Sequence, residues 1–223
     1  MACVYQLHQA AQERSARKVI ALADKYIIPI LNVMDYKELF RRLIAIIISP
    51  RKAWEEIVTE SPRKDVTQAF VYPLVALGGL AVLVDAMLEK GLKRMTFHEA
   101  MMDICGYCIA LFGGFFMASY LVDIVTQKYL KRQSDMPLAN LFVGYAMGVV
   151  FVADMLVMLF PQFFIFKWVL LIYVCYIVWE GSDVVLAVEE DKKLVYMAVL
   201  SIAIIFSPTI IGMLFNTLSK LLG

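Results

Sequence analysis

Polar and apolar residues are distributed along this chain in two distinct ways, and the first occupies residues 35–60. This segment reads DYKELFRRLIAIIISPRKAWEEIVTE, and its apolar run Leu43–Ile48 is too short to cross a bilayer. Apolar residues recur at helical spacing opposite a charged side. The apolar positions are Tyr36, Leu39, Phe40, Leu43 and Ile47, and the charged ones are Lys37, Glu38, Arg41 and Arg42. A basic amphipathic helix of this kind is typical of the membrane interface.

Ser49-Pro50 predicts a break followed by a second helix, because Ser caps a helix start and Pro suits the first turn. The second helix offers Trp54, Ile57 and Val58 on one side, and Trp favours the lipid headgroup layer. The sequence therefore predicts that this segment rests on one leaflet, with membrane lipids as its partner. The candidate interface residues are Phe40, Arg41, Arg42, Leu43, Arg51, Lys52 and Trp54.

From Ala69 onward the pattern changes to apolar runs of about 20 residues, long enough to span a membrane. Five spans are expected: Ala69–Leu88, Met101–Val125, Ala139–Phe160, Phe163–Leu186 and Leu194–Phe215. A proline in the last span, Pro208, predicts a kink. The expected fold class is all-α: a polytopic integral membrane protein with five transmembrane helices preceded by amphipathic interfacial helices.

Three regions follow from this pattern: an N-terminal extension (1–34), the amphipathic cytoplasmic segment (35–66) and the five-span membrane domain (67–223). The extension has no signal-peptide pattern. Two interpretations of it stay open, a cytoplasmic helix or a segment that precedes a true start at Met34.

Composition agrees with a membrane protein, since 61% of the 223 residues are hydrophobic and the mean hydropathy is +0.73. The formal net charge of +1 gives no basic excess, so no nucleic-acid partner is expected. The four cysteines lie mostly inside apolar runs and indicate no disulfide framework.

Basic residues predict the orientation, because cytoplasmic segments carry an excess of Lys and Arg. With the N-terminus inside, the inner segments (1–68, 126–138 and the one containing Lys192 and Lys193) hold sixteen basic residues and the outer segments five. The prediction is N-terminus inside and C-terminus outside.

Small residues predict close helix packing. Gly106, Ala110, Gly114 and Ala118 recur every four residues in the second span, and Gly144 and Gly148 do so in the third. Packing within one chain is the favoured interpretation, and contact with a second copy of the chain is the alternative.

Ionisable residues inside the spans are the natural candidates for chemistry. Asp154 and Lys167 lie on either side of the Pro161-Gln162 hairpin at similar depth, which predicts a structural ion pair. The alternative is a proton or ion relay that also uses Asp85 and Asp103. Near the inner side, Asp123, Glu180 and Asp183 are expected at solvated helix ends or at a cytoplasmic mouth.

No catalytic motif is present in the sequence, so neither an enzyme nor a cofactor or metal is expected. Cys105-x-x-Cys108 lies within an apolar run, where small packing residues are the favoured interpretation. His8 and His98 are isolated.

Three stretches between Tyr36 and Leu221 resemble the Yip family of small five-span membrane proteins. They are ISPRKAWEEI (48–57), Gly144-Tyr145, and Trp179-Glu180-Gly181 followed by Val188-Glu189-Glu190 and Tyr196. The first is similar to the opening of the bacterial members. Eukaryotic relatives bind Rab-type GTPases, but their acidic Tyr-Gly-Pro-type motif is absent here. The resemblance therefore implies a bacterial, non-catalytic member in the cytoplasmic (inner) membrane.

These features together predict a membrane scaffold or adaptor that binds a membrane-protein partner or a second copy of itself. Its contact surface would be the amphipathic segment and the basic 126–138 loop. The alternative is a small transporter or channel subunit that uses Asp85, Asp154 and Lys167. A transporter predicts a water-accessible cavity at those residues, whereas a scaffold predicts a close-packed core.

Overall fold

The computed structural model describes residues 36–60, 65–90, 97–188 and 190–222, all of them helical or in short connections. The chain divides into two compact units, Met1–Glu38 and Leu39–Gly223. Of the first unit only Tyr36–Glu38, the first turn of α3, is described, so the predicted 1–34 extension lies outside the described residues. The account below concerns the second unit.

Two short helices open the described chain, α3 (Tyr36–Ile48) and α4 (Pro50–Thr59). The predicted break is confirmed, since Ser49 lies between them with an extended φ of −141° and Pro50 is the first residue of α4. The Ser49 side chain makes no capping hydrogen bond.

The remaining helices are long and apolar. They are α5 (Tyr72–Lys90) with a π-helical turn before it (η2, Thr67–Val71), α6 (Phe97–Leu130), α7 (Met136–Leu159), α8 (Phe164–Val184) with a 3-10 turn before it (η3, Pro161–Phe163), and α9 (Glu190–Leu222). Five stretches within them are long and apolar enough to span a membrane, which confirms the predicted fold class. These are Thr67–Ala86, His98–Leu130, Met136–Leu159, Pro161–Val184 and Lys193–Leu221.

Helices α6 and α9 are longer than their predicted spans, at 34 and 33 residues. At 1.5 Å per residue each is about 50 Å long, which exceeds the hydrocarbon core of about 30 Å. The helical backbone thus continues beyond the apolar run, because the residues that follow it are compatible with a helix even though they are polar.

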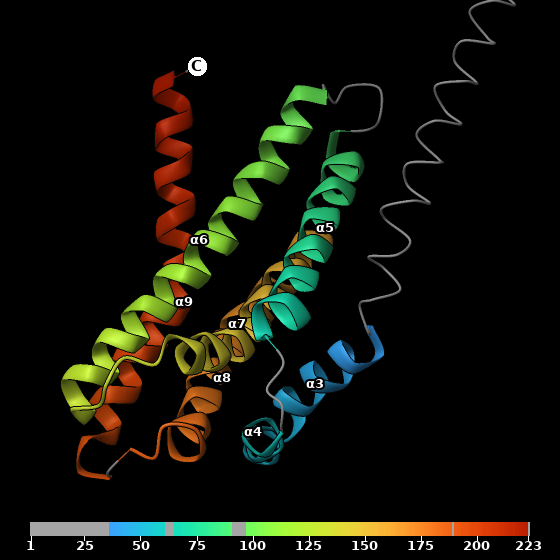
Figure 1. Cartoon of the computed structure of the whole chain (residues 1–223). Coiled ribbons are helices and arrows are strands. Elements are labelled where there is room, and N and C mark those ends of the chain that lie inside the picture. Colours follow the sequence, from blue (N-terminus) through green and yellow to red (C-terminus); the bar gives the residue numbers. More distant parts are fainter. Residues whose placement is uncertain (1–35, 61–64, 91–96, 189, 223) are drawn as a thin grey trace, which may run out of the picture. The chain divides into compact units, whose positions relative to one another are not determined.

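Helix α7 is the centre of the core. Every residue from Leu141 to Phe151 is buried, and α7 contacts α5, α6, α8 and α9. A helix that is apolar on all sides is stable when other helices surround it. Figure 1 shows α6 crossing α9.

The small-residue face of α6 packs against α9, as the favoured interpretation predicted. An added Cβ on Gly106 would lie 2.8 Å from the Phe215 ring, and one on Gly114 would lie 2.6 Å from Cα of Pro208. Gly144 and Gly148 of α7 receive Val66 and Phe70 in the same way. Pro208 lies inside α9, and α9 changes direction along its length in Figure 1.

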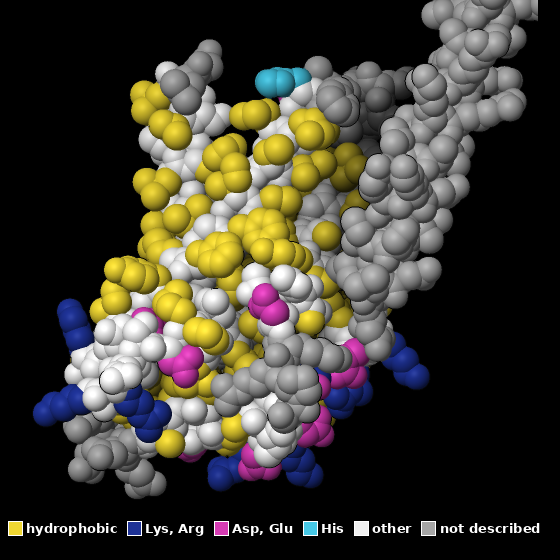
Figure 2. All heavy atoms as spheres, in the orientation of Figure 1, with side chains coloured by type: hydrophobic (Ala, Val, Ile, Leu, Met, Phe, Trp, Pro, Cys, Tyr) yellow, Lys and Arg dark blue, Asp and Glu magenta, His cyan; other side chains and the backbone are white. Residues whose placement is uncertain are grey.

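Charged side chains gather toward one end of the molecule. Figure 2 shows Lys, Arg, Asp and Glu side chains concentrated below a broad apolar surface, at the end where α4 and the connection between α6 and α7 lie. This end is polar because the helix boundaries and the α3–α4 pair meet there.

Candidate functional site

The α3–α4 segment (Leu39–Glu60) is attached to the helical bundle by one face of each helix. On α3 the buried side chains are Leu39, Leu43 and Ile46, and on α4 they include Ala53, Trp54 and Ile57. The Tyr173 hydroxyl of α8 donates a hydrogen bond of 2.7 Å to the carbonyl oxygen of Ile47. Both helices are therefore held in place by protein contacts.

Trp54 makes the most extensive of these attachments. Its side chain is 0% exposed, and its ring stacks on Phe142 of α7 with the centroids 5.3 Å apart. Its indole Nε1 donates to the carbonyl oxygen of Ile177 on α8, at 3.1 Å. An added Cβ on Gly181 would lie 2.8 Å from the Trp54 ring, so this glycine makes room for the indole.

This placement corrects the sequence interpretation of two interface residues. Trp54 and Leu43 were expected to meet the headgroup layer, but the structure buries both in the bundle. The reason is that the apolar side of an amphipathic helix can be covered by a neighbouring helix as well as by lipid. Here α7 and α8 cover the apolar sides of α3 and α4. Phe40 remains exposed, at 47%.

Arg42 of α3 bonds to Glu60 at the end of the α3–α4 segment and to Tyr145 of α7. Its Nη2 donates to both carboxylate oxygens of Glu60 at 2.7 Å each, and its Nη1 donates to the Tyr145 hydroxyl at 3.0 Å. The Arg42 side chain is only 12% exposed. A guanidinium held at two oxygens of one carboxylate has a fixed orientation. Arg42 therefore binds side chains of the protein and does not extend toward lipid.

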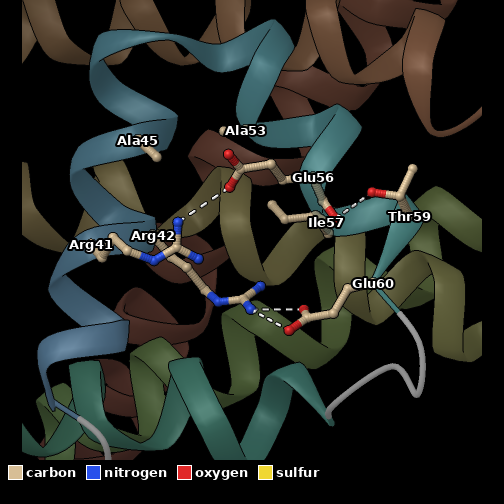
Figure 3. A pocket seen from close by; sticks show the side chains of 8 residues that line it. All are labelled: Arg41, Arg42, Ala45, Ala53, Glu56, Ile57, Thr59 and Glu60. Atoms are coloured by element: carbon tan, nitrogen blue, oxygen red, sulfur yellow. Dashed lines mark hydrogen bonds and ion pairs between the residues drawn. The ribbon is translucent and has the colours of Figure 1, made fainter.

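Between α3 and α4 lies a cavity of about 250 Å³, shown in Figure 3. Arg41 and Glu56 pair across it at 3.2 Å, and both side chains are more than half exposed. Pairs so exposed to water contribute little to stability, roughly 0–1 kcal/mol.

Arg51 joins α4 to α8. Its Nη1 lies 3.7 Å from Oε2 of Glu180, whose side chain is 13% exposed, and its Nε lies 3.6 Å from Oε1 of Glu55. Lys52, the next residue, is exposed. Of the predicted basic interface residues, Arg41, Arg51 and Lys52 are therefore exposed, whereas Arg42 is mostly buried.

Glu180 and Asp183, which were expected at solvated helix ends or at a cytoplasmic mouth, are paired with basic side chains. Glu180 faces Arg51, and Asp183 accepts from Nζ of Lys193, a lysine whose side chain is 8% exposed. The same Nζ lies 4.1 Å from the centroid of the Trp179 ring, a cation–π contact. Glu180 and Asp183, three residues apart, thus lie at the same end of α8 and pair with different cations.

Asp123 organises the connection between α6 and α7, a role that its sequence position did not indicate. Its carboxylate accepts from the Gln127 side chain and the Ser134 hydroxyl at 2.7 Å each, and from the backbone N–H of Asp135 at 2.9 Å. Asp135 in turn caps α7 by accepting from the N–H of Leu138. Of the predicted 126–138 loop, only residues 131–135 lie outside the two helices, since α6 continues to Leu130 and α7 begins at Met136. Asp123 bonds to the end of this connection.

Asp154 and Lys167 form the predicted ion pair. Nζ of Lys167 lies 2.7 Å from Oδ1 of Asp154, and the side chains are 33% and 22% exposed, respectively. A cavity of about 320 Å³ borders the pair between α6, α7, α8 and α9. Asp85 is half-buried on α5 and does not line this cavity, and Asp103 is exposed on α6. The structure thus brings together two of the residues considered for a relay.

Neither a disulfide nor a metal-binding cluster is found among the described residues. There, Cys105 and Cys108 are free thiols, and no cluster of three or more His, Cys, Asp or Glu residues has an arrangement suited to a metal ion. The expectation that the protein needs no cofactor stays a prediction.

Five apolar helices, four of them packed around the buried fifth, α7, define a polytopic integral membrane protein. The family model of the Yip1 domain matches residues 44–222, so the chain belongs to the Yip1 domain family, whose members are generally non-enzymatic membrane trafficking proteins. The family resemblance inferred from the sequence is thereby confirmed. No curated protein and no solved structure matches the chain.

Proposed function

We propose that this Yip1 domain protein is a non-enzymatic membrane scaffold or adaptor whose contact surface is the α3–α4 segment together with the basic 126–138 loop. The observation that carries the proposal is the attachment of Trp54, which fixes α4 to α7 and α8. A surface fixed in advance loses less conformational entropy when a partner binds, so it binds more tightly.

The outward side of the α3–α4 segment supports such a contact. Phe40, Ile44 and Ile48 are 47%, 52% and 73% exposed and recur every four residues, so they form one strip along α3. We propose that this strip rests in the headgroup layer. The exposed Arg41 and Lys52 would meet anionic headgroups or an acidic partner, each adding about 1 kcal/mol near an anionic surface.

The 126–138 loop supplies the second half of the surface. Asp123 accepts from the backbone N–H of Asp135 there, and three cations are exposed: Lys128 in the last turn of α6, and Lys131 and Arg132 in the connection. Lys131 has a φ of 52°, the left-handed conformation with which α6 ends. We propose that a membrane-protein partner, or a second copy of the chain, binds these cations.

We further propose that the protein is a bacterial-type member of its family in the cytoplasmic membrane, with the N-terminus inside and the C-terminus outside. The distribution of Lys and Arg supports this orientation, because most described basic residues lie at the end that carries α4 and the 126–138 loop.

Photo-cross-linking in intact membranes tests the proposal. A photoreactive residue at Lys52 or Gln133 should capture the same protein, whereas one at Ile202, a 59% exposed position on α9, should not. The Trp54→Ala substitution should reduce capture from position 52 several-fold, because it removes the attachment of α4. Tyr120→Ala, which alters a 59% exposed side chain of α6, serves as the control and should leave capture unchanged. Equal capture from all three positions, or from none, would contradict the proposal.

A transporter or channel subunit is the second candidate, because the cavity beside Asp154 and Lys167 is large enough to hold a small polar molecule. Against it stands the packing of α6. Between this cavity and a smaller one beside Asp123, the described part of α6 contributes Phe115 and Ala118, both 0% exposed. A close-packed core at this depth favours the scaffold.

A further inference from the structure

The cavity beside the Asp154–Lys167 pair, called the ion-pair cavity below, has the composition of a binding site. It measures about 320 Å³ and is lined mostly by apolar side chains, with a few polar groups among them. The polar residues are Tyr107, Asp154, Lys167 and Thr209. Sites for small ligands have this character, an apolar wall with a small number of placed polar groups.

Tyr107 is one of the lining residues, but its hydroxyl points away from the cavity. Its hydroxyl oxygen is buried and has no hydrogen-bond partner among the described residues. The ring is held firmly, since an added Cβ on Gly78 of α5 would lie 2.5 Å from it. The hydroxyl oxygen itself would lie 2.6 Å from that Cβ, on the side of α5, a helix that contributes no lining residue, so it does not face the cavity.

Lys167 also retains unused donors. An ammonium group carries three N–H bonds, and Nζ of Lys167 has one carboxylate partner, Asp154, in the described part of the chain. Its side chain is 33% exposed, so a phosphate or other anion can reach it without displacing the wall of the cavity.

The cavity opens toward the surface that lipid covers. Three of its lining residues, Phe164, Trp168 and Phe206, are 54%, 58% and 53% exposed. All three are large and aromatic, the kind of side chain that gathers at the membrane–water interface.

The depth of the charges agrees with a lipid headgroup. Asp154 lies five residues before the end of α7 at Leu159, and Lys167 lies three residues after the start of α8 at Phe164. At 1.5 Å per residue these are about 8 Å and 5 Å from the helix ends that meet at the hairpin. The interfacial layer on each side of the hydrocarbon is of similar thickness, about 5–8 Å.

From these observations we infer that the ion-pair cavity binds a phosphoethanolamine group, the zwitterionic headgroup of an ethanolamine phospholipid. Its ammonium would donate to the Asp154 carboxylate, and its phosphate would accept from Lys167. The pair carries no net charge, so it complements a zwitterion better than an anionic headgroup, which would face Asp154 with like charge. A choline headgroup has no N–H with which to hydrogen-bond the carboxylate.

This inference is independent of the proposed contact surface, because the ion-pair cavity shares no residue with the α3–α4 segment or the 126–138 loop. Either can therefore fail without the other.

Native mass spectrometry of the purified full-length protein tests the inference. The protein is exchanged into equal parts of phosphatidylethanolamine, phosphatidylcholine and phosphatidylglycerol. We expect at least tenfold enrichment of the ethanolamine lipid among the bound molecules. Lys167→Gln and Asp154→Asn should each reduce the enrichment at least fivefold, whereas Tyr107→Phe, which removes a hydroxyl that does not face the cavity, should leave it unchanged. Lys220→Gln, which removes an exposed cation at the far end of α9, is the matched control and should leave it unchanged. Equal retention of the three lipids, or unchanged enrichment in Lys167→Gln, would overturn the inference.

A second measurement does not depend on how the variants fold. The melting temperature of the wild-type protein in detergent should rise by several degrees on addition of phosphatidylethanolamine and should not rise with phosphatidylcholine, since a ligand that binds the native state stabilises it. Glycerophosphoethanolamine, the water-soluble headgroup, is added in a separate arm. Stabilisation by the lipid alone assigns the source to the membrane, and equal stabilisation by both assigns a soluble phosphoethanolamine compound. No rise with either contradicts the site.

Discussion

An added Cβ on Gly114 of α6 would lie 2.6 Å from Cα and 2.7 Å from N of Pro208 on α9, so the two helices meet backbone to backbone at this point. Pro208 has no N–H to donate within α9, and its ring lies against a residue that has no side chain. Such close approach is how helices associate in lipid, where apolar burial does not distinguish a neighbouring helix from the acyl chains.

We predict that Gly114→Ala destabilises the protein by about 1–3 kcal/mol, because the new methyl group meets backbone atoms that cannot move aside. Gly79→Ala is the matched control. An added Cβ there lies 3.6 Å from Sγ of Cys108, an ordinary contact, so this variant should be neutral or slightly more stable. Unfolding of both variants by a denaturing detergent measures the difference. Equal stability of the two would show that α6 and α9 do not meet as described.

Trp54 should carry most of the attachment of α4 to the bundle. We predict that Trp54→Ala costs about 3–5 kcal/mol, since it leaves a cavity beside Phe142, and that Trp54→Phe costs less because the stacking survives without the hydrogen bond to Ile177. Protease cleavage near Lys52 reports the release of α4. If the Ala variant is cleaved no faster than the wild type, other contacts hold this helix.

The Asp154–Lys167 pair should be required as a pair for stability. Replacing either residue alone by Leu leaves an unpaired charge in the membrane and should cost up to about 3 kcal/mol. Replacing both should recover much of the loss, because apolar packing often substitutes for a buried pair. Thermal unfolding in detergent without added lipid measures the four variants of this cycle. A double variant less stable than both single variants would rule out this account.

The five-span topology makes a prediction about sidedness. In a variant without native cysteines, Gln133→Cys should react with a membrane-impermeant reagent from the cytoplasmic side, and Leu221→Cys, at a 77% exposed position, from the opposite side. The reason is the excess of Lys and Arg in the segments assigned to the inside. Labelling of both cysteines from the same side would overturn the topology.

Much of the candidate site was predictable from residue spacing, and part of it was not. Asp154 and Lys167 were recognisable because a tight hairpin places residues equally far from its centre at equal depth. The bond from Arg42 to Glu60 and Tyr145 had no such signal, since its partners lie 18 and 103 residues away and no local period relates them. The ion-pair cavity was likewise invisible, because it depends on how four helices diverge.

The sequence by itself determined the class of protein, the number of spans, the break at Ser49-Pro50 and the membership in the Yip1 domain family. These depend on local composition, on period and on the length of apolar runs, which the bilayer thickness converts directly into helices. Only the tertiary structure decided which surface covers each apolar stripe. Trp54 and Leu43 face α7 and α8, whereas Phe40 on the same helix as Leu43 faces outward. The physical reason is that lipid and a neighbouring helix are both apolar, so a hydrophobic pattern shows that a side chain avoids water without showing which of the two it meets.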